Sequence, residues 1–230
     1  MKRLMISLWL GLAGFAAAQT TNILALHSAR FGAAGGGIGD QLYVCAGYGF
    51  DGALDSVERL DPATGSVTTL PIRVAARWFL GSTIWRDRLI LAGGVRTSSE
   101  ITPGGRTDLV ELVDPVGGTV SNLPPLPSPR SLPALAVVGD QLYAIGGAVS
   151  EEPQSRRIGD VSIYDFNLGT WREGPPMPTA RECAVAVIGS RIYALGGFDG
   201  SNSLDVVEVF DTENNTWESR PKLAAPQSAH

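Results

Sequence analysis

Lysine and histidine are scarce in this sequence, and their scarcity argues against two classes of function. The 230 residues include only two lysines, Lys2 and Lys222, and two histidines, His27 and His230, and the net charge is −5. Nucleic-acid binding needs a basic face, so nucleic acid is not an expected partner. No histidine or cysteine cluster has the spacing of metal ligands, so neither a metal site nor a cofactor is expected.

Cysteine is equally rare. Cys45 and Cys183 each lie within an apolar run of the kind that forms a strand. Two cysteines do not make a disulfide framework, although an exported protein could pair them. Buried free thiols are the expectation, with a disulfide as the alternative.

Long hydrophobic runs are absent after the first residues, and the single early run has the features of a secretory signal. Lys2 and Arg3 precede the apolar stretch of residues 4–15, and small residues around Ala18 offer a cleavage site. The run is shorter than the roughly 20 residues of a spanning helix, so cleavage is favoured over an uncleaved anchor. We therefore expect a signal peptide over residues 1–18 and a secreted or periplasmic mature protein that does not associate with membrane.

Glycine and proline are abundant, with 28 and 15 residues, and a glycine-ended phrase occurs four times. Each copy is an apolar run that ends in two small residues, and the final glycines are 47, 53 and 50 residues apart. Self-similarity at a nearly constant period indicates a repeat architecture. The four copies are Leu42–Gly47, Leu89–Gly94, Leu142–Gly147 and Ile192–Gly197.

Each phrase has the same neighbours. An arginine lies upstream and is followed by a small or apolar run and a two-residue polar turn, such as Gly139-Asp140. Downstream is an alternating strand that ends in aspartate, then a turn and a short strand. That last strand contains Trp171 and Trp217 in the third and fourth units, and Val67 and Val120 at the corresponding places in the first two. Each unit therefore predicts four short strands in about 50 residues, and helix signals are nearly absent after residue 20. The continuous apolar run of the first strand predicts burial on both faces, and the alternation of the third strand predicts one buried and one more exposed face.

These motifs resemble the kelch repeats over residues 27–230. The resemblance depends on the double glycine, the tyrosine before it, the Val-Glu-x-apolar-Asp strand and the later tryptophan; the unit from Tyr193 to Trp217 is the closest match. It implies an all-β propeller over residues 19–230 with four four-stranded blades. The expected blades cover residues 27–72, 73–126, 127–177 and 178–223, and residues 224–230 begin a further repeat.

Kelch propellers usually have six or seven blades, so four units leave the ring in question. One alternative is a fragment or short homologue that forms an open or incomplete ring. The others are a small closed four-bladed ring and a half-ring completed by a second chain. An open ring exposes an apolar blade face and unpaired edges, which favours self-association.

The repeated arginines are the candidate ligand-binding residues. They precede the innermost strands, where a propeller places them around one mouth of its central channel. Because guanidinium groups bind carboxylates in a bidentate manner, they could form a cationic rim for an acidic ligand. The alternative is a framework role, with hydrogen bonds to carbonyls of a neighbouring blade or to aspartates such as Asp61. The arginines are Arg30, Arg77, Arg130 and Arg181.

Other motifs are weaker. The glutamates Glu58, Glu111 and Glu208 recur on the third strands and are interpreted as surface or inter-blade groups, and no catalytic residue is assigned. Two long loops, residues 97–106 and 151–157, are the preferred places for partner recognition.

An exported binding module for a protein or carbohydrate ligand, acidic if the rim hypothesis holds, is the favoured function. The alternative is an enzyme that resembles the kelch-fold sialic acid mutarotases (N-acetylneuraminate epimerases) of bacteria. Those enzymes are exported, as the signal peptide predicts for this chain. Arg181 with Glu182 would be its arginine and acid-base pair. Adjacent residues on a strand point to opposite faces, which argues against the pair. We therefore favour a bacterial binding protein over an enzyme.

Overall fold

The structure is a computed structural model that describes residues 25–96, 105–151 and 154–228. The expected signal peptide and residues 97–104 and 152–153 of the two long loops lie outside these ranges. Within them, the regular elements are strands joined by tight turns, as the sequence predicts. No helix in the described part of the chain has the length and apolar character needed to cross a membrane.

The strands form four four-stranded antiparallel sheets, one for each repeat, which confirms the predicted blades. Blade 1 contains β1 (Ala34–Ile38), β2 (Gln41–Cys45), β5 (Ser56–Asp61) and β6 (Ser66–Arg73). Blade 2 contains β7 (Gly81–Trp85), β8 (Arg88–Ala92), β9 (Val110–Asp114) and β10 (Thr119–Leu123). Blade 3 contains β11 (Ala134–Val138), β12 (Gln141–Ile145), β15 (Val161–Asp165) and β16 (Thr170–Gly174). Blade 4 contains β17 (Glu182–Ile188), β18 (Arg191–Phe198), β19 (Val207–Asp211) and β20 (Thr216–Arg220).

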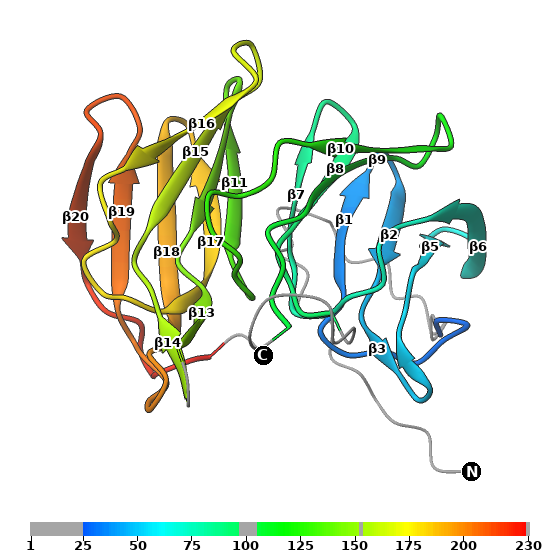
Figure 1. The fold of residues 1–230 in the computed structure, drawn as a ribbon, viewed down its shortest axis with the longest axis horizontal. Helices are drawn as coiled ribbons and strands as arrows, with labels where there is room; N and C mark the ends of the chain where they lie inside the picture. Colours follow the sequence, from blue (N-terminus) through cyan, green and yellow to red (C-terminus); the bar gives the residue numbers. More distant parts are fainter. Residues whose placement is uncertain (1–24, 97–104, 152–153, 229–230) are drawn as a thin grey trace.

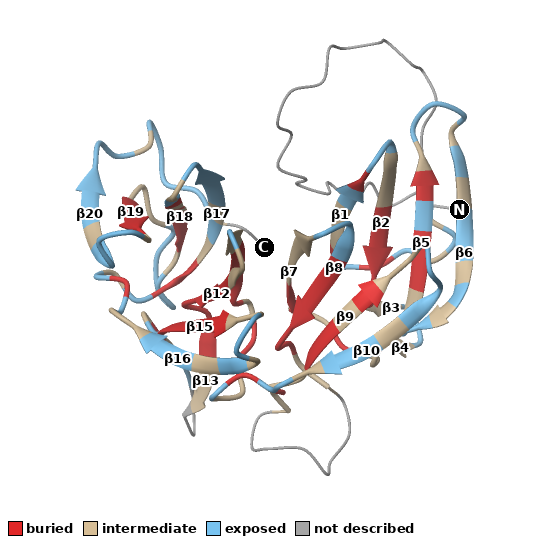
Figure 2. Cartoon of the chain, turned by 90° about the horizontal axis from the view of Figure 1, so that it is seen from above, coloured by how far each residue is buried: buried red, intermediate tan, exposed pale blue. Residues whose placement is uncertain are grey.

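The four blades follow one another along an arc (Figure 2). The first strand of each blade is innermost, and these strands lie side by side in the order β1, β7, β11, β17. The blades at the two ends of the arc, with β1 to β6 and β17 to β20, lie on opposite sides of the view. The radial arrangement of sheets is the one that the repeat pattern predicts.

Apolar side chains between neighbouring blades hold the arc together. Between blades 3 and 4, Tyr143 and Ile145 pack with Ile192 and Phe210, all of them buried. Trp171 fills the edge of the junction between blades 2 and 3, and its indole N–H donates to the carbonyl of Pro124 at 2.9 Å. Tyrosine and tryptophan side chains therefore fill the space between blades.

The inner strand of blade 4 departs from the expected burial on both faces. Ala184, Ala186 and Ile188 are exposed, and Ile188 has 66% of its surface accessible. Their counterparts in blade 3, such as Ala134 and Ala136, are buried because β17 packs against β11. No described blade covers the corresponding face of β17, so the arc leaves an apolar face uncovered there.

The arc has two faces, and the connections divide regularly between them (Figure 1). We call the lower face in that view the loop face; it contains the connections that follow the double glycines, including the hairpins β3–β4 (Tyr48–Gly49, Gly52–Ala53) and β13–β14 (Ala148–Glu151, Gln154–Arg157). We call the opposite face the turn face; it contains the two-residue turns and the turns between the third and fourth strands.

A carboxylate closes each turn between the third and fourth strands. In blade 3, Asp165 accepts hydrogen bonds from the main-chain N–H groups of Asn167 and Leu168 at 2.8 and 3.1 Å. Such bonds favour the ionised form and lower the pKa of the carboxyl group. The main causes are the Thr64 hydroxyl for Asp61 and the N–H groups of Gly117 for Asp114, Leu168 for Asp165 and Asn214 for Asp211.

We expect these four carboxylates to make the fold acid-sensitive. Because their pKa values are lower in the folded than in the unfolded chain, their stabilisation is present above pH ~4 and is lost as the pH falls through the folded pKa. Replacing all four with asparagine, which keeps an acceptor oxygen, should flatten the fall of stability below about pH 5. The measurement is urea unfolding at a series of pH values, with Asp51→Asn as an exposed control; an unchanged pH profile would contradict the assignment.

Candidate functional site

The four repeat arginines lie inside the blades. Each is between 0% and 3% exposed, and each guanidinium lies alongside the second and third strands of its own blade. Arg181 is typical: its Nε donates to the carbonyl of Gly196 at 2.7 Å and its Nη2 to that of Ala194 at 3.2 Å. These donors are therefore used within the fold.

Glutamates on the third strands are the ionic partners of three of these arginines. Arg30 pairs with Glu58, Arg77 with Glu111 and Arg181 with Glu208, and both members of each pair are buried. The interpretation of these glutamates as surface groups was wrong, because all three are buried. Glu111 and Glu208 do lie between blades, on the sheet face that packs against the preceding blade. A buried guanidinium requires such a counter-charge.

The glutamates also accept hydrogen bonds from the incoming chain. Glu111 accepts from the main-chain N–H of Ala75 at 2.9 Å, and Glu208 accepts from the Thr179 hydroxyl at 2.8 Å. Burial lowers the pKa of Arg77, and Glu111 opposes that shift. The pairs thus fix the start of each blade, and these contacts agree with the framework alternative. A ligand-binding role for the arginines stays a prediction.

The residue after each repeat arginine lies on the loop face. It forms a bridge with the residue that follows the double glycine of the same blade. In blades 1 and 2 these positions are mainly aromatic, and in blades 3 and 4 they are mainly small or charged. The bridged pairs are Phe31 with Tyr48, Trp78 with Val95, Ser131 with Ala148 and, within the bulge of β17, Glu182 with Phe198.

The aromatic half of the loop face is a contiguous cluster that joins two blades. The ring of Tyr48 lies 4.9 Å from that of Trp78 in an edge-on arrangement, and the ring of Phe31 lies 5.5 Å from Tyr48 and 6.0 Å from Phe79. Phe31 is 54% exposed, and Phe50, at the tip of the β3–β4 hairpin, is fully exposed. This half offers apolar aromatic area to solvent.

Phe79 is held in an unusual conformation within this cluster. Its φ of 55° lies in the left-handed region, which a bulky side chain rarely adopts. The main chain fixes it there, because its N–H donates to Gly32 at 2.8 Å and its carbonyl accepts from Leu132 at 2.7 Å. Gly32 and Leu132 hold the corresponding positions of blades 1 and 3 with φ of 59° and 54°, so this conformation belongs to the repeated framework.

The polar half is a set of hydrogen bonds that cross from blade to blade. Arg106 of blade 2 donates to the hydroxyls of Ser131, Ser150 and Ser155 of blade 3 at 3.0, 2.7 and 2.5 Å. Burial and the nearby Arg157 lower the pKa of Arg106, and Glu182 opposes this shift. The β13–β14 hairpin is thereby fixed against its neighbour.

Arg157 continues this chain of contacts. It donates to Glu182 of blade 4 at 3.2 Å and lies over the ring of Phe198 at 5.0 Å from its centre. Glu182 is therefore partnered by Arg157, and Arg181 by Glu208, so the arginine and acid-base pair of the mutarotase alternative is not formed.

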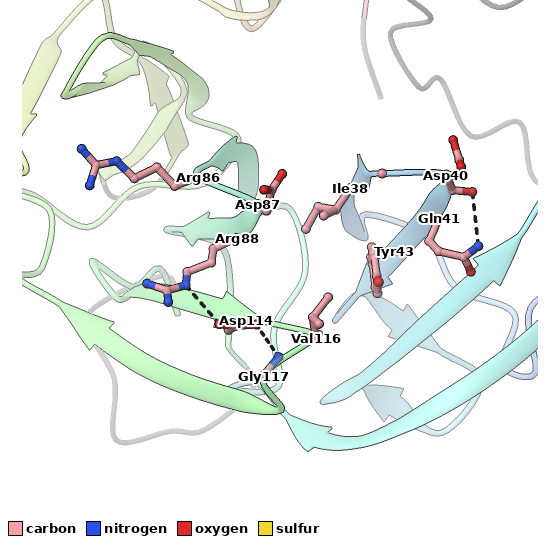
Figure 3. Close-up of a pocket in the computed structure, with 11 residues that line it drawn as sticks. Ile38, Asp40, Gln41, Tyr43, Arg86, Asp87, Arg88, Asp114, Val116 and Gly117 are labelled. Atoms are coloured by element: carbon pink, nitrogen blue, oxygen red, sulfur yellow. Dashed lines mark hydrogen bonds and ion pairs between the residues drawn. The ribbon is translucent and has the colours of Figure 1, made fainter.

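A shallow groove lies on the turn face between blades 1 and 2 (Figure 3). Ile38, Tyr43 and Val116 contribute apolar surface, and charged side chains surround them. The charges are largely paired already: Arg88 contacts Asp114 at 3.1 Å, and Arg86 extends away from the groove to Asp140 at 3.0 Å.

Chemistry beyond binding finds little support among the described residues. They include no group of three or more His, Cys, Asp and Glu side chains able to hold a metal ion. Both cysteines are free, and burial raises the pKa of Cys45 to about 12 and that of Cys183 to about 11. Neither thiol is activated as a nucleophile.

The repeat also matches known family models. Residues 111–229, more than half of the chain, match the model of the FKB95 kelch-repeats domain, and residues 29–72 match the kelch motif. The chain belongs to the kelch-repeat family. Its four blades are kelch repeats, and the double glycine, the buried Arg–Glu pair and the inter-blade tryptophan are the features that this chain repeats.

Two curated kelch proteins that are similar to this chain come from a plant and an animal. An F-box/kelch-repeat protein of Arabidopsis thaliana is 40% identical over 113 residues, which are 47% of this chain and 27% of that protein. Kelch-like protein 36 of Mus musculus is 29% identical over 199 residues, 81% of this chain and 30% of that protein. The chain spans less than a third of the length of either relative, and neither supports the expected bacterial origin.

Sequence reasoning selected the repeat arginine but not the adjacent residue, which lies on the loop face. The repeat arginine attracts attention because it recurs, yet invariance across repeats is also what a framework residue shows. The adjacent position changes from Phe31 and Trp78 to Ser131 and Glu182. The signal available in the sequence was this variation at the position directly after an arginine that all four repeats keep.

Proposed function

We propose that this kelch-repeat chain is a protein-interaction module that binds its partner on the loop face. The aromatic cluster of Phe31, Tyr48, Trp78 and Phe79 supports the proposal, because exposed aromatic side chains on a rigid scaffold supply most of the energy of many interfaces. Kelch repeats in general mediate protein interactions, and the chain has four of them.

The division of the loop face favours a protein segment over a carbohydrate or a small molecule. The aromatic half offers apolar area, and Arg106 and Arg157, although already bonded to serines and to Glu182, place two positive charges beside it. A peptide with an apolar anchor followed by acidic residues would meet both halves. This keeps the acidic ligand expected from the sequence, with different arginines as its partners.

Export belongs to the same proposal. The apolar segment at residues 4–15, with its basic start and small residues near Ala18, supports a cleaved signal peptide and a partner met outside the cell or in the periplasm. N-terminal sequencing of the expressed protein tests this point, with Gln19 as the expected first residue; a start at Met1 would contradict it.

We expect loss of two exposed aromatic rings to weaken binding strongly. The probe is a 12-residue peptide selected against the wild-type chain from a random phage-displayed library. In Phe31→Ala/Phe50→Ala, the dissociation constant of this peptide should rise about 30-fold or more, which corresponds to roughly 2 kcal/mol of lost anchoring. Isothermal titration calorimetry measures the change.

Val116→Ala/Leu168→Ala is the matched control. These two apolar residues are 79% and 74% exposed, but they lie on the turn face. Their replacement should leave peptide affinity unchanged, and both double variants should unfold at the wild-type temperature. Equal weakening by the two variants, or failure of the library to yield any peptide, would argue against the loop face as the binding surface.

A further inference from the structure

The third blade keeps the repeat arginine but has no glutamate to pair with it. Ser162 occupies the place of Glu58, Glu111 and Glu208 on the third strand. Arg130 is nevertheless as buried as the other three arginines, with 1% of its surface exposed. Blade 3 therefore buries a guanidinium without the carboxylate that neutralises it elsewhere in this chain.

The contacts of Arg130 do not replace that charge. Its Nη2 donates to the hydroxyls of Ser128 and Ser162 at 2.9 and 3.3 Å, and its Nη1 donates to the carbonyl of Asp160 at 3.4 Å. Its Nε is buried and has no hydrogen-bond partner among the described residues. In the sister blades the corresponding Nε atoms of Arg77 and Arg181 donate to glycine carbonyls.

Asp160 is the nearest acidic residue, but it is exposed and forms no ion pair with Arg130. Burial lowers the pKa of Arg130, and the charge of Asp160 only opposes this shift from a distance. An isolated buried cation is costly, whereas a buried cation with a hydrogen-bonded counter-ion is tolerated. The electrostatics of blade 3 therefore favour an anion close to the guanidinium.

The local donor set suits a small anion. A serine side chain lacks the second methylene and the carboxylate of a glutamate, so Ser162 does not reach as far toward the guanidinium as Glu111 does in blade 2. The hydroxyls of Ser128 and Ser162 accept from Arg130 and keep their own protons for donation. With the Nε proton, these hydroxyls give three donors around the guanidinium.

We propose that blade 3 binds a chloride ion beside Arg130, between Ser128 and Ser162, at the place where the other blades insert a glutamate carboxylate. The bound ion supplies in blade 3 the negative charge that a glutamate side chain supplies in the other three blades. This site is separate from the loop face and does not depend on the partner proposed there.

Halide-dependent thermal stability tests the proposal. The full chain is unfolded in sodium chloride and in sodium gluconate at matched sodium concentration, because gluconate is too large for the site. Above the dissociation constant, each tenfold rise in chloride should raise the wild-type Tm by roughly 3–5 °C relative to gluconate. An equal Tm in both salts at every concentration would overturn the proposal.

Ser162→Glu is the decisive variant, because it installs the carboxylate that the other blades already accommodate. It should unfold at a higher Tm than the wild type in gluconate and lose the chloride-dependent increment. Retention of the full increment in Ser162→Glu would overturn the proposal. The variant Asp160→Asn tests Asp160 as the alternative counter-ion. It should keep the chloride-dependent increment in Tm. Loss of both the increment and stability would identify Asp160 as the counter-ion of Arg130.

Bromide shows directly where the halide binds, which a measurement of stability does not. Crystals of the wild-type chain grown in sodium bromide should show an anomalous peak within hydrogen-bond distance of Arg130 Nε and Ser162 Oγ, and crystals of Ser162→Glu should show none there. A peak at surface positions alone would mark the halide effect as nonspecific and would overturn the site.

Discussion

Arg77→Met should destabilise the chain by about 3–5 kcal/mol, the expected cost of leaving one member of a buried ion pair without its partner. The substitution removes the cation that neutralises Glu111, and the carboxylate stays enclosed with only the N–H of Ala75 as a donor. Methionine fills much of the arginine volume, so a large cavity does not explain the loss. Urea unfolding monitored by tryptophan fluorescence measures it.

The same substitution in the next blade provides the control. Arg130→Met leaves no carboxylate unpaired, because Ser162 stands where Glu111 does. Its cost should be limited to the lost hydrogen bonds to Ser128, Ser162 and Asp160, about 1–2 kcal/mol. If both variants lose the same stability, packing and not charge pairing determines the role of the repeat arginine.

Gly147→Ala should cost about 3 kcal/mol or more, because the second glycine of each pair has a conformation that alanine cannot adopt without strain. Its φ is 95°, and a Cβ would lie 2.5 Å from the carbonyl oxygen of Ser131. The other blades repeat this geometry, with φ of 97°, 107° and 109° at Gly47, Gly94 and Gly197. Chemical denaturation of the single variant checks the expectation.

Ala46→Gly tests the first position of the double glycine, which is alanine in blade 1. Ala46 has a φ of 58°, within the left-handed region that an ordinary residue reaches at moderate cost. Restoring the glycine of the other repeats should relieve strain and raise unfolded-state entropy, and these opposite effects should leave stability within about 1 kcal/mol of the wild type. A change as large as that of Gly147→Ala would show that the two positions are not distinct.

Periodicity made most of the fold predictable from the sequence. Four copies of a glycine-ended phrase predict four sheets, and the correspondence of Val67 and Val120 with Trp171 and Trp217 is reproduced in the strand register. The burial of β17 was mispredicted because an apolar run shows what a strand could bury against, and not whether a neighbouring blade is there.

The site was less predictable, since charge pairing depends on where side chains point across a sheet. The alternation of Val207, Glu208 and Val209 indicated one buried and one exposed face. In the structure all three are buried, and Glu208 is paired with Arg181. An arginine and a glutamate 27 residues apart give no local pattern, and only their joint recurrence in three repeats links them.

Consecutive blades are also joined by one main-chain hydrogen bond that recurs along the arc. The N–H of the second glycine donates to the carbonyl of the next repeat's arginine, as in Gly94 to Arg130 at 2.9 Å, and Gly197 donates to Gln227 in the same manner. Each blade is therefore coupled only to its nearest neighbours. Amide protons should exchange slowest in blades 2 and 3, which have a blade on either side, and local opening should begin at the outer two.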